Sequence, residues 1–149
     1  MARVSTSIEI AVPPRAVWDV IMDPRRYGDW VTIHRKVGKL DDGPLREGFE
    51  VEQTLALAGA PFKVRWRLAV HDPPHHAIWE GRGPARSTAR IEDTLTAAGA
   101  GTRFDYLNDF KAPGGPLGAM AGRVLVSGIS EREANRSLRR LKQLLEEGS

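Results

Sequence analysis

The stretch of sequence that decides the fold is IEIAVPPRAVWDVIMDPRRYGDW, residues 8–30. It contains the end of an alternating apolar strand, a Pro-Pro turn, a short amphipathic helix and an Asp-Pro break that leads into Tyr27 and Trp30. The paired prolines suit the first turn of a helix, where their missing N–H groups are not needed, and Asp23-Pro24 ends that helix. We therefore expect one strand, then two short helices whose aromatic side chains pack on a sheet.

The rest of the chain contains strand-like runs that are separated by turns rich in Gly, Pro and Asp. Short turns favour antiparallel pairing, because a parallel crossover needs a dozen or more residues. Together with the first strand, these runs predict a seven-stranded antiparallel sheet. The six runs after the early helices are residues 33–40, 49–57, 62–71, 77–83, 87–96 and 102–110.

The C-terminal part has apolar residues at three- and four-residue spacings, which predicts a long helix over 131–146 that covers the apolar face of the sheet. Upstream, residues 112–118 are rich in Gly and Pro and read as a hinge loop. We expect residues 115–127 to form a first helical part that acts as a lid. Its apolar positions are Leu117, Met120 and Val124.

In this order, these pieces resemble the START-like or SRPBCC superfamily, also called the polyketide cyclase/dehydrase or Bet v 1-like group. The most specific motifs are residues 17–20, VWDV, followed by Asp23-Pro24 and Trp30, and the turn at residues 101–103, GTR. The resemblance covers nearly the whole chain. It implies an α+β helix-grip fold: a curved seven-stranded antiparallel sheet, two short helices after the first strand and a long C-terminal helix. It also implies a cavity between sheet and helix for a hydrophobic or aromatic molecule, lipids included.

The composition fits one ligand-binding domain over residues 1–149, with 41% hydrophobic and 28% charged residues. No apolar run approaches the ~20 residues of a membrane span, and the N-terminus lacks the features of a secretory signal, so we expect a cytoplasmic protein without stable membrane insertion. The absence of cysteine excludes disulfides and thiol catalysis. The 22 basic and 19 acidic residues are spread along the chain, which does not favour nucleic acid as a partner.

Strand alternation identifies the side chains that would line the cavity. Residues 62–70 alternate between apolar positions, Val70 included, and outward basic positions, of which Arg65 and Arg67 are two. On the next strand a tryptophan and a glycine share a face, and a glycine there exposes backbone to a ligand. The alternative is that the aromatic residues simply fill a core and the glycines mark a bend. The expected ligand-binding residues are Gln53, Val64, Trp66, Leu68, Trp79, Gly81, Ile91, Asn108, Phe110, Leu117, Met120 and Val124.

The same alternation of side chains along each strand predicts that a few polar residues also face inward: Thr6, Gln53, Asp93, Tyr106 and Asn108. A buried Asp93 requires a hydrogen-bond or charge partner, and without one the pKa of its carboxyl rises. Alternatively, Asp93 lies near a strand end or pairs with an arginine and is structural.

Some proteins similar to this one are aromatase/cyclases, which polarise carbonyls with a pocket arginine. If this chain is such an enzyme, its expected catalytic residues are Asp93, Tyr106 and, only if Trp79 faces outward, Arg82. We expect no metal or organic cofactor, because His71, His75 and His76 bracket a turn instead of converging.

Three functions follow as hypotheses. The first is binding of a small hydrophobic or aromatic ligand, and the second is a polyketide cyclase/dehydrase-type activity on a poly-keto chain. The third is a protein-interaction module of toxin-like or chaperone-like type, whose outer face with Arg65 and Arg67 docks on an acidic partner of unknown identity.

Overall fold

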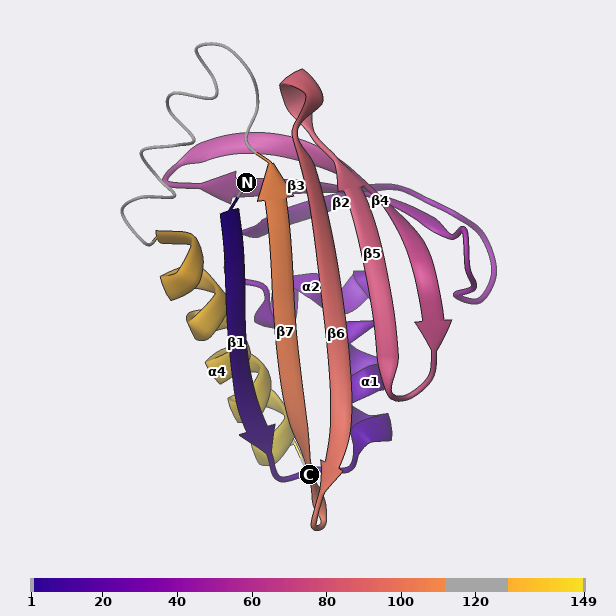
Figure 1. Ribbon diagram of the computed structural model, residues 1–149, viewed down its shortest axis with the longest axis vertical. Helices are drawn as coiled ribbons and strands as arrows, with labels where there is room; N and C mark the ends of the chain where they lie inside the picture. The colour runs from indigo at the N-terminus through magenta and orange to yellow at the C-terminus, as the bar shows by residue number, and fades with distance from the viewer. Residues whose placement is uncertain (1, 112–128, 149) are drawn as a thin grey trace.

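The computed structural model describes residues 2–111 and 129–148 (Figure 1). The strands are β1 (Ala2–Ile10), β2 (His34–Leu40), β3 (Glu50–Leu57), β4 (Ala60–Asp72), β5 (His76–Arg82), β6 (Thr88–Ala98) and β7 (Gly101–Lys111). The helices are α1 (Pro14–Ile21), α2 (Tyr27–Trp30) and α4 (Ile129–Glu147), with 3-10 turns η1 (Pro24–Arg26) and η2 (Pro84–Arg86). The predicted lid over residues 115–127 and the hinge loop before it lie outside the described residues.

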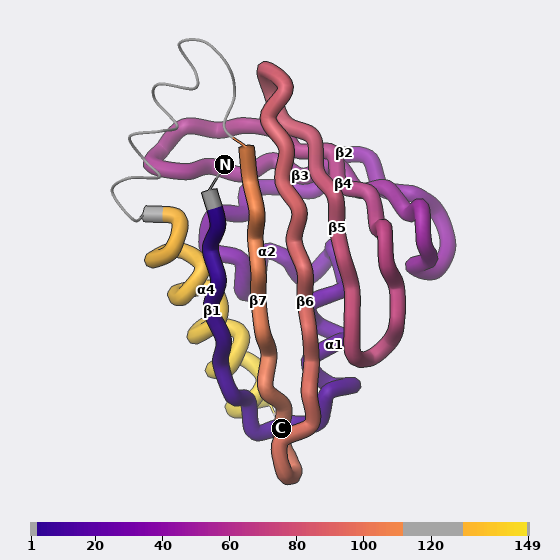
Figure 2. Tube along the Cα trace, in the orientation of Figure 1, coloured from indigo at the N-terminus to yellow at the C-terminus, as the bar shows by residue number. Residues whose placement is uncertain are grey.

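The strands of the described part form one seven-stranded antiparallel sheet in the order β1-β7-β6-β5-β4-β3-β2. The chain meanders from β2 to β7, and β1 then adds beside β7. In Figures 1 and 2, β2, β3 and β4 bend across one end of the sheet, while α4 lies behind β1 and β7 and α1 behind β6 and β5. The predicted helix-grip architecture is confirmed.

The early helices form where the sequence predicts them. Pro14 occupies the first position of α1, and the helix buries one face, with Val17 entirely inaccessible to solvent. The carboxylate of Asp23 then accepts a hydrogen bond from the backbone N–H of Arg25 at 3.0 Å and caps η1. Tyr27 and Trp30 are buried in the core, as expected.

Apolar packing and side-chain hydrogen bonds hold α4 on the sheet. Leu138 and Leu141 are buried, and the hydroxyl of Thr6 on β1 donates to Asn135 Oδ1 at 2.5 Å. At the other end, the backbone N–H of Ala11 donates to the carboxylate of Glu146 at 2.9 Å. The helix is therefore fixed to β1 in its N-terminal half and, near its C-terminal end, to the residue that follows β1. No helix among residues 2–111 and 129–148 is long and apolar enough to cross a membrane.

The strand β4 departs from the simple alternation that the sequence predicts. Leu68 pairs with Trp79, but Val70 pairs with Ile78, so the register shifts by one residue between them. Such a bulge reverses the phase of the residues beyond it. The prediction that Val70 faces inward is therefore wrong. His71 takes the inner position, opposite Ala77, and its ring lies 5.8 Å from that of Trp18.

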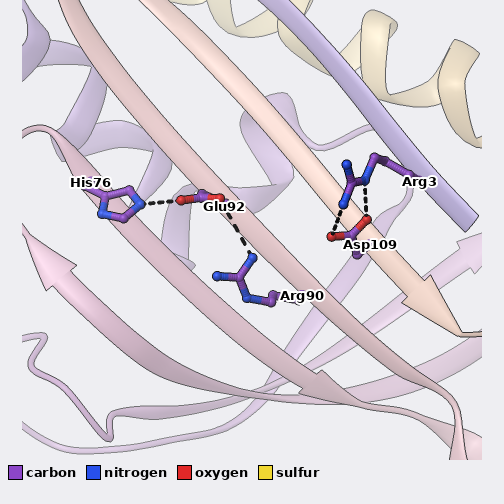
Figure 3. Close-up of polar contacts among 5 residues, drawn as sticks. All are labelled: Arg3, His76, Arg90, Glu92 and Asp109. Carbon is purple, nitrogen blue, oxygen red and sulfur yellow. Dashed lines mark hydrogen bonds and ion pairs between the residues drawn. The ribbon is translucent and has the colours of Figure 1, made fainter. Parts of the chain in front are cut away.

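The outer face of the sheet carries a row of alternating charges rather than a uniformly basic surface. Cross-strand neighbours in this row are Glu50, Arg67, Glu80, Arg90, Asp109 and Arg3, from β3 through to β1. Figure 3 shows the ion pair between Arg3 and Asp109, 2.7 Å between Nε and Oδ1, and the neighbouring contacts of Glu92 with His76 and Arg90. Arg67 has acidic neighbours on both sides, Glu50 and Glu80. Opposite charges on adjacent strands stabilise the sheet.

Candidate functional site

Polar side chains from three adjacent strands meet on the inner face of the sheet. Tyr106 on β7 lies opposite Thr6 on β1 and opposite Asp93 on β6. Asn108 follows on the same face of β7, and its Nδ2 donates to the Tyr106 hydroxyl at 3.3 Å. The structure thus brings together the inner-face polar residues that alternation identifies on β1, β6 and β7. We call Asp93, Tyr106 and Asn108 the inner polar group.

Asp93 is the charged residue of this group. Its side chain is buried, and within the described part of the chain it makes no hydrogen bond or ion pair. Burial raises the pKa of the Asp93 carboxyl to about 7, and the nearby charge of Glu92 adds to that rise. Burial also raises the pKa of Tyr27 and of Tyr106, and for both the charge of Asp93 contributes. A carboxyl that exchanges its proton near neutral pH therefore lies close to two phenol groups.

Two buried polar atoms, one on α2 and one on β7, have unused hydrogen-bonding capacity. Trp30 Nε1, a donor, and Asn108 Oδ1, an acceptor, have no partner among the described residues. A buried polar atom that lacks a hydrogen bond costs about 1–3 kcal/mol, and native proteins contain few of them. A molecule that offers both an acceptor and a donor would remove this cost.

Packing along the inner face of β7 changes from one end of the strand to the other. Thr102 and Phe104 are completely buried, and the Thr102 hydroxyl donates to the carbonyl of Val12 at 2.7 Å. Tyr106, Asn108 and Phe110, on the same face, are only half-buried, as is Ile91 on β6. The fully packed core therefore lies at one end of β7, and Tyr106 and Asn108 lie where the packing is less complete.

A second set of hydrogen-bonded polar side chains links β4, β3 and β2 in the curved part of the sheet. Trp66 Nε1 donates to Gln53 Oε1 at 2.9 Å, and Gln53 Nε2 lies 2.9 Å from His34 Nδ1. Because an indole nitrogen can only donate, the amide oxygen of Gln53 faces Trp66 and its NH2 group donates to His34. Nδ1 of His34 is then an acceptor, so the ring is neutral with its proton on Nε2. Partial burial and the charge of Arg35 lower the pKa of His34, which agrees with this arrangement.

The remaining candidate ligand-binding residues belong mostly to the core. Their members in the described part are Val64, Trp66, Leu68 and Trp79, all buried. A Cβ atom placed on Gly81 would lie 2.6 Å from Trp66 Cζ3, so the Trp66 ring already occupies the space above that glycine. Gly81 is therefore explained by the packing of the Trp66 ring in the core, as in the alternative in which aromatic residues simply fill the core. Leu117, Met120 and Val124 lie outside the described residues.

Arg82 is exposed on the outer face, where it lies opposite Arg65, while Trp79 and Gly81 face inward. Its guanidinium does not join the inner polar group. Neither a polar role for Trp30 nor a partner for His34 follows from the sequence. The apolar helical pattern marks Trp30 only as buried, and the contact of His34 with Gln53 depends on strand register. No cluster of three or more potential metal ligands occurs among residues 2–111 and 129–148.

A curved antiparallel sheet that grips a C-terminal helix, with polar groups on its inner face, defines the class of helix-grip proteins. Two solved structures share this fold across nearly their whole length. The Zhui aromatase/cyclase from Streptomyces sp. R1128 superposes with a TM-score of 0.80 at 20% identity, covering 97% of this chain and 93% of its own. The protein TTHA0849 from Thermus thermophilus superposes with a TM-score of 0.78 at 15% identity, covering 99% of each chain.

Residues 1–146 match the family model described as polyketide cyclase/dehydrase and lipid transport, and the chain belongs to this family, which is of the SRPBCC type. Among curated relatives, the toxin Rv0910 of Mycobacterium tuberculosis is 27% identical over 137 residues, which cover 91% of this chain and 95% of the relative. The uncharacterized protein Rv1546 of the same organism is 26% identical over 135 residues, which cover 88% of this chain and 93% of the relative.

Proposed function

We propose that this protein binds a small hydrophobic or aromatic molecule between the inner face of the sheet and α4. The observation that carries the proposal is that two buried polar atoms, Trp30 Nε1 and Asn108 Oδ1, have no partner among the described residues, in a protein that also buries the Asp93 carboxyl. The half-buried apolar residues of β6 and β7 would contribute affinity at ~25 cal/mol per Å2 of apolar surface removed from water. The polar atoms would fix the orientation of the ligand.

The expected ligand is a molecule with an apolar body and at least one hydrogen-bond acceptor for Trp30. A hydroxyl or amide group on the same molecule would donate to Asn108 Oδ1. The family description, which includes both polyketide cyclases and lipid transport, is consistent with this chemistry.

Purification under native conditions, followed by organic extraction and mass analysis, tests the proposal. We expect a hydrophobic or aromatic compound to copurify with the wild-type protein. Trp30→Phe keeps the ring but removes the donor, so its affinity for that compound should fall by roughly tenfold, the value of one buried hydrogen bond. Trp18→Phe makes the same chemical change at a buried tryptophan whose Nε1 is not among the unpartnered buried atoms, so it should bind normally. The proposal fails if nothing copurifies and a panel of aromatic and fatty compounds shows no saturable binding.

A second candidate is an enzyme of the cyclase/dehydrase type, and the pKa of about 7 at Asp93 favours it. In its ionised form, a carboxylate with that pKa can remove a proton from the carbon next to a carbonyl. The resulting carboxylic acid can then give the proton to the departing hydroxyl group, which leaves as water. The Tyr106 hydroxyl would donate a hydrogen bond to the carbonyl oxygen. Arg82 has no part in this candidate mechanism, because it is exposed on the outer face.

Incubation of the protein with its copurified compound, or with a synthetic poly-keto chain, separates the two candidates. Recovery of every compound unchanged supports binding alone. Conversion by the wild-type protein but not by Asp93→Asn supports the enzyme.

The protein-interaction module and the cytoplasmic location stay predictions. The name of the mycobacterial relative, a toxin, is consistent with a protein partner. The basic outer face expected for such a partner is limited, because Arg67 lies between Glu50 and Glu80 in the charge row.

A further inference from the structure

A surface pocket of about 290 Å3 lies between α4, the loop that joins α2 to β2, and the β3–β4 hairpin. Arg35 of β2 lines one side, and Glu133, Arg136 and Arg140 of α4 line another. The three α4 residues are spaced by three and four positions, so they share one face of the helix. Residues far apart in the sequence therefore place three guanidinium groups around one depression.

The acidic residue of this pocket is already engaged. The Glu133 carboxylate accepts a hydrogen bond from the Thr32 hydroxyl at 2.5 Å and pairs with Arg136 at 2.9 Å. Within the described part of the chain, Arg35 reaches only the carbonyl oxygen of His34, at 3.3 Å, and Arg140 forms no ion pair. Two of the three positive charges are therefore uncompensated.

This concentration of positive charge is unfavourable for the protein by itself. Arg136 and Arg140 are four residues apart on a helix, a spacing at which like charges repel. An anion in the pocket would offset that repulsion, because it attracts both guanidinium groups. The lining of the pocket thus has the electrostatics of a binding site that is complete only with a negatively charged ligand.

Hydrogen bonds also fix the walls of the pocket relative to one another. The backbone N–H of Ala56 donates to the Ile33 carbonyl at 2.8 Å, which joins the hairpin to the loop before β2. The backbone N–H of Thr32 donates to the Ser137 hydroxyl at 3.0 Å, which joins that loop to α4. A ligand would therefore meet a preformed site and would not have to order its walls.

We propose that this pocket binds a phosphate-type oxyanion, carried either by a soluble phosphate monoester or by a lipid head group. Guanidinium groups present paired N–H donors that match phosphate oxygens, and Arg35 and Arg140 are available for this from two different elements. The volume equals that of about ten water molecules, which is ample for a phosphate group and part of its ester. The site is separate from the inner polar group, and the inference does not depend on the proposed function.

Titration with inorganic phosphate, followed by calorimetry and by amide NMR shifts, tests the site. We expect saturable binding, with the shifts centred on Arg35, Ala58, Gly59 and Arg140. The double variant Arg35→Ala/Arg140→Ala should weaken binding by about tenfold or more, since it removes two charge-assisted contacts. Glu133→Gln keeps a hydrogen-bond acceptor but removes the negative charge, so it should tighten binding.

Arg139→Ala is the matched control, because Arg139 is exposed on the same helix but does not line the pocket. It should bind phosphate within about twofold of the wild type, because Arg139 does not line the pocket and its exposed charge is screened by salt. Equal weakening by Arg139→Ala and the double variant, or shifts that do not saturate, would overturn the proposal.

Two further experiments distinguish a soluble phosphate ester from a lipid head group. Binding of glycerol 3-phosphate at least as tight as inorganic phosphate supports a soluble ester. Flotation with phosphatidylcholine vesicles that contain phosphatidic acid, but not with phosphatidylcholine alone, supports a lipid head group, provided that the double variant abolishes it. Failure of inorganic phosphate, the soluble ester and the vesicles together would exclude a phosphate site.

Discussion

Asp93→Asn is expected to stabilise the folded protein at pH 8 by as much as about 4 kcal/mol, with little effect at pH 4. Burial, with help from the charge of Glu92, raises the pKa of this carboxyl from 3.8 to about 7. Each unit of difference between the folded and unfolded pKa values corresponds to about 1.4 kcal/mol. Asparagine has nearly the same shape and cannot ionise, so the variant avoids the cost of a buried charge.

The sign of the pH dependence follows from proton binding. Between about pH 4 and pH 7 the folded protein holds a proton on Asp93 that the unfolded chain has released, so wild-type stability falls as the pH rises. The stability that this proton contributes is fully present at pH values below the pKa of Asp93 in the unfolded chain. It is lost once the pH exceeds the pKa of Asp93 in the folded protein. The asparagine amide has unmade hydrogen bonds of its own, but their cost is the same at every pH.

Urea unfolding from pH 4 to pH 8.5 measures this effect, and a 13C NMR titration of the Asp93 carboxyl gives its midpoint directly. Asp105→Asn removes one negative charge from the outer face of β7 and controls for net charge, since Asp105 pairs with Arg103 at the surface. If the difference between wild type and Asp93→Asn is constant with pH, the carboxyl does not carry the raised pKa.

The sequence predicts the fold because its strongest signals are local. The order of a strand, a Pro-Pro turn, a short helix and an Asp-Pro break is encoded within residues 8–30, and these elements form as expected. Alternation also places Asp93, Tyr106 and Asn108 on one face correctly, because β6 and β7 pair without a register shift over their whole length. The alternation of side chains therefore predicts the inward face correctly wherever two strands pair without a register shift.

The same reasoning fails where the ladder is irregular. The bulge in β4 turns Val70 outward and His71 inward, and register shifts in β2 decide which β3 residue meets His34. Such shifts come from the bending of the sheet around the helices, a property of the whole fold. The unpartnered donor of Trp30 is equally invisible in the sequence, since the helical pattern reports that the ring is buried but not what its Nε1 meets.

Gly81→Ala is expected to destabilise the protein by about 2–6 kcal/mol, although alanine adds only one methyl group. The new Cβ would lie 2.6 and 2.7 Å from two ring atoms of Trp66 and 2.8 Å from Val64 Cγ1. Overpacking of this kind costs roughly 1–3 kcal/mol. Displacement of the Trp66 ring would also break its hydrogen bond to Gln53, which leaves a buried amide oxygen unpaired at a further cost of about 1–3 kcal/mol.

Chemical unfolding gives the loss of stability, and the indole N–H resonance of Trp66 reports whether the hydrogen bond to Gln53 survives. Gly28→Ala is the matched control, because its Cβ would meet only His34 Cδ2, at an ordinary 3.6 Å. Within α2 that change should be neutral or stabilise by up to about 1 kcal/mol, as alanine in place of glycine does in helices. Equal stability of the two variants, with the Trp66 resonance unmoved, would mean that the inner face over Gly81 has room to spare. Gly81 would then be available to a ligand, as a pocket wall requires.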